Sequence, residues 1–176
     1  MTTPSTLTLE QTDLLESLAR HRFFLRNTTR DMSEEQIRLR STVSELTLGM
    51  LIKHVTDMER QWVDFIVDGP SAIGNFSDEL TPEQIAAWSA RWQLADDVTL
   101  ADLLAESDRV ARRTEEVVAA LPDLNAAHPL PSAPWFEPGA KWSARRVLLH
   151  LIAETSQHAG HADIIREAID GAKSMG

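Results

Sequence analysis

The sequence predicts an all-α fold, a four-helix bundle with long second and third connections. Four segments carry apolar residues at the three- and four-residue spacing of an amphipathic helix. No segment has the alternating pattern of a strand of useful length. A chain of 176 residues can bury a substantial core, so we expect a single domain over residues 1–176.

The ends of the four long helices are predicted from capping residues and helix breakers. The expected bounds are, in chain order, about Leu9 to Arg30, Ser44 to Gly69-Pro70, near Thr99 to Pro122, and Ser143 to Asp170 before Gly171. In the first connection, Ser33 and Gln36 form the pattern of a capping box, which predicts a short helical turn.

The second and third connections carry their own patterns. Thr81-Pro82 predicts a short helix with Pro at its first position. Trp88 and Trp92 are four residues apart, and we expect them to anchor this segment to the bundle. Residues 122–141 contain five prolines and no periodicity, which predicts a loop.

Composition excludes several classes of function. A formal net charge of −10 argues against a nucleic-acid partner, because such proteins neutralise phosphates with Lys and Arg. The apolar runs are too short to span a bilayer. Residues 1–10 lack a basic segment followed by an apolar stretch, so we expect no signal peptide and a cytoplasmic location.

The chain contains no cysteine and no tyrosine. Disulfides, thiolate metal ligands and a protein thiol nucleophile are therefore absent. Any thiol chemistry would have to use a small-molecule thiol.

The last predicted helix carries a polar stripe at positions i, i+4, i+8 and i+11: His150, Glu154, His158 and His161. Glu154 and His158 lie one turn apart on one face and can grip a single divalent cation. His54, on the second predicted helix, can supply a third ligand. Two histidines and one carboxylate with an open position are typical of a catalytic metal site.

Spacing alone leaves alternatives open. His158 with His161 and His150 with Glu154 are also pairs at helical spacing. The alternative interpretation of the stripe is a seam of hydrogen bonds inside the bundle, and the metal site is favoured over it. Burying these groups without a partner would cost several kcal/mol, and a divalent ion would satisfy most of them at once.

Two segments resemble the DinB-like superfamily: the run from His150 to Gly171 and the run from Gly49 to Arg60. The resemblance is closest to an actinobacterial branch usually filed as a domain of unknown function, and it extends over nearly the whole chain. It implies a DinB-like four-helix-bundle domain with one bound metal. Mycothiol-dependent maleylpyruvate isomerases are similar in using a His, Glu, His triad around zinc.

Carried over to this chain, the resemblance implies His54, Glu154 and His158 as metal ligands. Zinc is the expected ion, and nickel, iron and manganese fit the same ligands. His161 is the expected catalytic residue, through proton transfer or support of a ligand. Arg146 and Gln157 depart from the usual pattern, where relatives tend to have Trp and Arg, and this leaves substrate specificity open.

The implied function is that of a metal-dependent S-transferase or isomerase that uses a mycothiol-type thiol on small electrophiles. A metal-dependent small-molecule hydrolase and a non-catalytic metal-binding stress protein are the alternatives. Three tryptophans outside the long helices suggest a homodimer without locating its interface: Trp88, Trp92 and Trp135.

Overall fold

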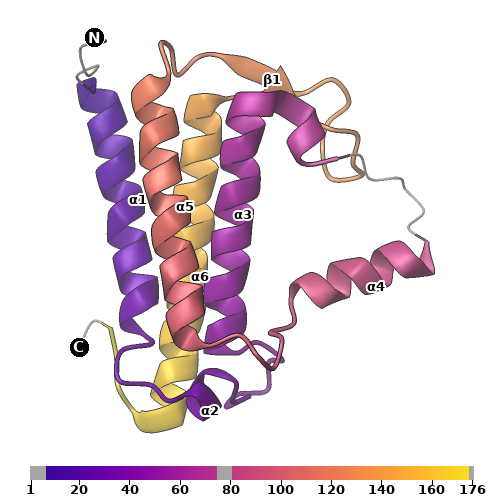
Figure 1. Cartoon of the computed structure of the whole chain (residues 1–176). Coiled ribbons are helices and arrows are strands. Elements are labelled where there is room, and N and C mark those ends of the chain that lie inside the picture. The colour runs from indigo at the N-terminus through magenta and orange to yellow at the C-terminus, as the bar shows by residue number, and fades with distance from the viewer. Residues whose placement is uncertain (1–6, 75–80, 175–176) are drawn as a thin grey trace.

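The computed structural model of the chain describes residues 7–74 and 81–174, without the side chains of Gln84, Ala87, Trp88 and Arg91. It confirms the all-α bundle. The elements are α1 (Leu9–Asn27), α2 (Glu34–Ile37), α3 (Leu48–Asp68), the 3-10 helix η1 (Gly69–Ala72), α4 (Pro82–Arg91), α5 (Leu100–Ala120), β1 (Ala127–Pro129), β2 (Lys141–Ser143) and α6 (Ala144–Asp170). In Figure 1, α1, α3, α5 and α6 form the bundle and α4 projects from its side.

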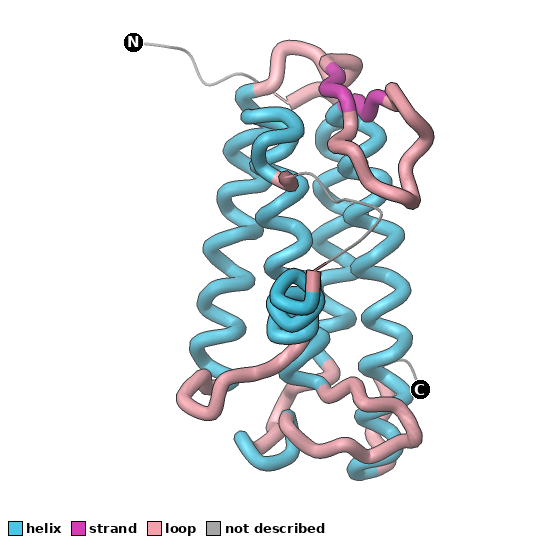
Figure 2. Tube along the Cα trace, turned by 90° about the vertical axis from the view of Figure 1, so that its right-hand side faces the viewer, coloured by secondary structure: helices cyan, strands magenta, loops and turns pink. Residues whose placement is uncertain are grey.

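Helix direction explains the long connections. In Figure 1, α1 and α6 run one way along the bundle, and α3 and α5 run the other way. α3 packs against both α5 and α6, and α1 packs against α6. Because α3 and α5 are parallel neighbours, the chain between them must return along the length of the bundle. Figure 2 shows this return on one side, with α4 seen end-on.

Local capping chemistry sets most helix ends where the sequence predicted them. Thr8, Ser33 and Thr99 each form a capping box with the residue three positions on. Ser143 caps α6, and Gly171 ends it in the left-handed conformation at φ 80°. Pro82 is the first residue of α4, as expected.

Two predicted ends were wrong. α3 is capped by Thr47 and not by Ser44, because the Thr47 hydroxyl accepts the Met50 N–H while the Ser44 hydroxyl accepts the N–H of Leu46 in a turn. α1 ends at Asn27, three residues before Arg30. Beyond it, the buried Arg166 guanidinium donates to the carbonyls of Thr28 and Arg30.

The third connection contains a short hairpin that the sequence did not predict. β1 and β2 pair antiparallel, with His128 opposite Trp142. Each strand has only three residues, which is too short for an alternating pattern to be recognised. The hairpin closes one end of the bundle beside η1 (Figure 1).

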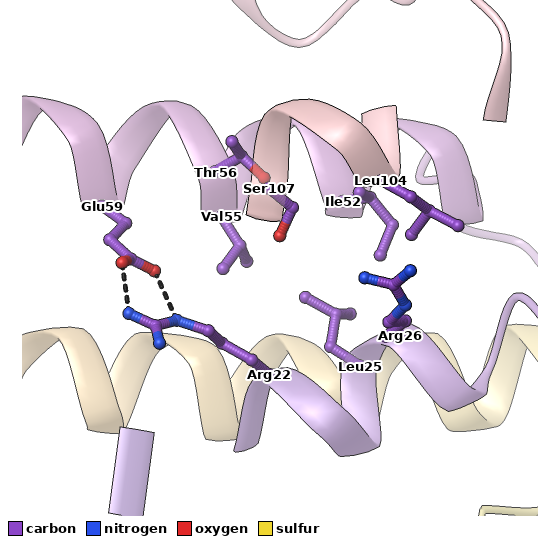
Figure 3. A pocket seen from close by; sticks show the side chains of 9 residues that line it. All are labelled: Arg22, Leu25, Arg26, Ile52, Val55, Thr56, Glu59, Leu104 and Ser107. Carbon is purple, nitrogen blue, oxygen red and sulfur yellow. Dashed lines mark hydrogen bonds and ion pairs between the residues drawn. The ribbon is translucent and has the colours of Figure 1, made fainter. Parts of the chain in front are cut away.

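A buried ion pair joins α1 to α3 inside the bundle. Glu59 is only 3% exposed, and its carboxylate accepts two hydrogen bonds from Arg22, one of them from Nε at 2.9 Å. The hydroxyl of Thr114 on α5 donates to the same carboxylate. Arg22 and Glu59 line a small cavity of about 10 Å³, room for about one water, and Figure 3 shows the two side chains pointing toward each other.

Removing one partner of this ion pair should be costly. Glu59→Ala leaves the Arg22 charge without compensation in a low-dielectric site, and we expect a loss of about 3–5 kcal/mol in the free energy of unfolding. Glu106→Ala is the control, since Glu106 pairs with Arg60 in a more exposed position and should cost about 1 kcal/mol or less. Urea unfolding measures both, and equal losses would contradict a special role for Glu59.

Two helical glycines provide a matched test of packing. A Cβ at Gly49 on α3 would lie 2.7 Å from Cδ2 of Leu94, whereas a Cβ at Gly160 on α6 would meet nothing within 4 Å. Gly160→Ala should therefore gain about 0.5–1 kcal/mol from helix propensity. Gly49→Ala should show no such gain in stability, because the added Cβ would clash with Leu94. Thermal unfolding compares the two variants. An equal gain in stability at both positions would show that Leu94 does not occupy the space beside Gly49.

Candidate metal centre

The site lies where α3 and α6 pack antiparallel. His54 stands on α3, and Glu154 and His158 stand one turn apart on α6. His54 and Trp62 are eight residues apart on α3, as are His150 and His158 on α6. Antiparallel packing therefore brings His54 to His158 and Trp62 to His150, with ring centroids 4.9 Å and 5.1 Å apart.

Three ligand-type side chains converge at this point. One ring nitrogen of His54, one of His158 and a carboxylate oxygen of Glu154 all lie within 4.8 Å of one another. His158 is buried, and His54 and Glu154 are half-buried. Within residues 7–74 and 81–174, no other group of three His, Asp or Glu side chains converges in this way. Of the alternatives that spacing left open, the geometry favours this triad.

Burial keeps the two histidines neutral. Desolvation, followed by the neighbouring His158, lowers the pKa of His54 to about 4. Desolvation also lowers the pKa of His158, against the opposing effect of the Glu154 carboxylate. A neutral imidazole offers a lone pair, which is the form that binds a metal.

The donor set fits a divalent ion. Nε2 of His158 and Oε2 of Glu154 are 3.5 Å apart, longer than a normal N–H···O hydrogen bond. That separation is close to the roughly 3.3 Å edge of a tetrahedron with zinc bonds of 2.0–2.1 Å. Two imidazoles and one carboxylate are also a ligand set that zinc accepts in catalytic sites.

His161 lies beside the triad. Its Nδ1 is 3.4 Å from Nδ1 of His158. Because Nε2 of His158 faces Glu154, its Nδ1 is left to face His161. Two bare lone pairs would repel at this distance, so one of these nitrogens carries the proton.

His150 is not one of the three converging side chains and belongs to an aromatic cluster. Its ring lies 5.1 Å from the rings of both Trp62 and Trp142, which stack on each other at 4.7 Å. The guanidinium of Arg146 lies 5.0 Å from the centre of the Trp142 ring. Desolvation lowers the pKa of His150. Arg146, which departs from the family pattern, thus contacts Trp142, four residues before it in the chain.

Trp92 makes a contact that sequence reasoning missed. Its indole stacks on the imidazole of His54, with centroids 3.8 Å apart and planes 17° apart. The expectation that Trp92 anchors its segment to the bundle agrees with this contact, but its partner could not be read from spacing. The same expectation for Trp88 falls on a side chain outside the described residues.

Comparison with known protein families identifies the family of this chain. A family model described as mycothiol S-transferase matches residues 13–171. The chain belongs to the mycothiol S-transferase family. Because that family is DinB-like, the resemblance drawn from the His150–Gly171 run is confirmed. A search of curated proteins found no match.

None of the helices in the described ranges combines the length and apolar character needed to cross a bilayer.

The lowered pKa values predict a pH dependence of stability. Between the ordinary pKa of 6.5 and the folded value of about 4, unfolded His54 binds more protons than folded His54. The free energy of unfolding of the metal-free protein should therefore fall as pH falls from 7 to 5. The contribution of His54 should stay below the limit of about 1.4 kcal/mol per pH unit for one proton, because its ring is partly exposed, and the lowered pKa values of His150 and His158 add to the slope.

Urea unfolding after chelator treatment measures this slope. Above pH 5 the carboxylates contribute little, since their ordinary pKa is 4.5 or below. His54→Gln should flatten the slope, and an unchanged slope in that variant would contradict the assignment to His54.

Proposed function

We propose that this member of the mycothiol S-transferase family is a metal-dependent enzyme that transfers a mycothiol-type thiol to small electrophiles. His54, Glu154 and His158 would hold one divalent ion, with zinc as the first candidate. The observation that carries the proposal is the convergence of these three ligand atoms within 4.8 Å. An isomerase that begins with the same thiol addition is the closest variant of this function.

The candidate metal ligands and the absence of cysteine both favour a reaction with a small-molecule thiol. A divalent ion held by His54, Glu154 and His158 would supply Lewis acidity and would lower the pKa of a bound thiol. The chain has no cysteine, so the sulfur nucleophile has to come from the cosubstrate. In the transfer, a sulfur–carbon bond forms, the bond from carbon to the leaving group breaks, and the thiol proton is released.

His161 is proposed to hold His158 in its ligating orientation. If His158 binds through Nε2, its Nδ1 carries the proton and donates to Nδ1 of His161, 3.4 Å away. Metal-binding histidines usually donate their second ring N–H in this way. Direct proton transfer by His161 stays a prediction of the sequence, because its ring lies beside Nδ1 of His158 and not beside the ligating Nε2.

The alternatives make different predictions. A hydrolase would act on its substrate without any thiol, and a metal-binding stress protein would lose much of its stability on chelation. The transferase should consume thiol and electrophile one for one. The identity of the ion, the homodimer and the cytoplasmic location remain predictions of the sequence.

The first test is the metal content per chain, measured by elemental analysis on protein purified without chelator or nickel resin. We expect about one zinc per chain in the parent and little in Glu154→Ala. Glu167→Ala is the matched control on the same helix, because Glu167 is half-exposed and pairs with Lys173. His161→Ala should weaken zinc binding by about 10- to 100-fold.

The same proteins are then assayed with mycothiol and an alkyl or aryl halide. Thiol consumed and halide released should match in the parent and in Glu167→Ala, and both should be lost in Glu154→Ala. A parent that binds no metal after incubation with zinc would overturn the proposal. Halide release without thiol consumption would favour the hydrolase instead.

A further inference from the structure

Trp92 contacts two of the three proposed ligands. Its indole stacks on His54 at 3.8 Å, and it meets the ring of His158 edge-on at 6.4 Å. Trp92 is itself half-buried. Its indole therefore lines the candidate centre in addition to stacking on one ligand.

Trp92 connects α4 to the bundle, and its backbone N–H donates to the carbonyl of Ser89 in the last turn of α4. Figures 1 and 2 show α4 projecting away from the bundle, and Trp92 is the first residue after it. Residues 92–98, which we call the strap, bring the chain back to the bundle. The anchors of the strap must therefore lie in the strap itself.

Arg38 holds the strap by its backbone. Its guanidinium donates to the carbonyl oxygens of Leu94, Ala95, Asp96 and Val98, the last at 2.6 Å. One charged side chain thus contacts four carbonyls of an irregular segment, of which that of Ala95 also accepts the N–H of Val98. Arg38 directly follows α2, so the strap is tied to the first connection.

Leu94 anchors the strap to α3. It packs into the notch left by Gly49, five residues before His54 on the same helix. Leu94 and Val98 both pack on the core cluster that contains Leu51 and Ile52. Two anchors, Arg38 and the packing of Leu94, therefore fix the chain two to six residues after Trp92.

His54 differs from the other two proposed ligands in how it is held. Glu154 and His158 share one helix, which fixes their spacing. His54 comes from another helix, and the second side-chain torsion of a histidine is broad and weakly restrained by itself. A flat indole against the imidazole restricts that rotation.

We propose that Trp92 is a positioning residue for the metal centre, holding the His54 ring so that one nitrogen faces Glu154 and His158. The inference rests on the proposed metal triad. It assigns the second connection a role in metal binding, with the strap as the element that delivers the indole.

Zinc affinity tests the proposal, measured by competition with a chromophoric chelator. Trp92→Ala should weaken zinc binding by about 10-fold, the size of effect seen when a residue that orients a ligand is removed. Trp92→Phe keeps a flat ring and should retain most of the affinity. Trp135→Ala is the control, since Trp135 lies in the third connection against Phe136.

The strap gives a second, independent variant. Arg38→Ala should lower zinc affinity with Trp92 still present, because the strap loses its backbone anchor. Arg40→Ala, an exposed arginine two residues away, should leave the affinity unchanged. A loss in the first variant alone supports delivery of the indole by the strap.

NMR of the metal-free protein tests the stack without any ion. The His54 ring protons should resonate upfield in the parent and in Trp135→Ala, because they lie over the indole face. This shift should disappear in Trp92→Ala. Circular dichroism checks that each variant folds, and Trp92→Leu replaces Trp92→Ala if the smaller side chain prevents folding.

The outcomes separate this inference from the proposed function. If the parent binds zinc and Trp92→Ala binds it equally well, the positioning role is overturned and the triad stands. If the parent binds no zinc, the proposed function fails, and the role of Trp92 fails with it. A weaker Trp92→Ala rescued by Trp92→Phe supports the role.

Discussion

The antiparallel contact between α3 and α6 is the constraint on which the rest of this structure depends. It sets His54 against His158 at one level and Trp62 against His150 two turns away. A slip of one turn, about 5.4 Å, would put Met58 opposite His158 and disperse the three ligand atoms. The candidate centre is thus a property of the register between two helices, and neither helix carries it alone.

Contacts on the far side of α3 hold that register. Glu59 turns away from the metal centre and meets Arg22 of α1 and Thr114 of α5 in the core. A buried charge without its partner is far more costly than a paired one, so sliding α3 along its neighbours is opposed. Residues 92–98 also pack against α3, where Leu94 occupies the space beside Gly49. This contact further opposes sliding of α3.

Local chemistry made much of this fold predictable. The capping box of Thr99 and the glycine at 171 involve neighbours in sequence, and the structure has both. Ser44 misled the prediction because Ser and Thr both favour the N-cap position and Thr47 lies three residues on. Glu154 and His158 were predictable as a pair since one helix spaces them, whereas excluding His150 required the register between helices.

The contacts that escaped prediction join segments far apart in the chain. Nothing near Trp92 in sequence indicates His54, and nothing near Glu59 indicates Arg22 or Thr114. The hairpin was missed for a different reason: three-residue strands are too short to show a period.

Burial of His54 and His158 between helices affects both metal binding and stability in acid. Desolvation makes protonated His54 and His158 costly, so both rings stay neutral. Neutral rings are what a metal needs, and the same desolvation makes the metal-free fold less stable in acid. An ion at this site would bind the folded state and not the unfolded chain, and it would offset the cost of burying the Glu154 carboxylate. The stability of the fold and its ability to bind a metal therefore both depend on the burial of the same side chains.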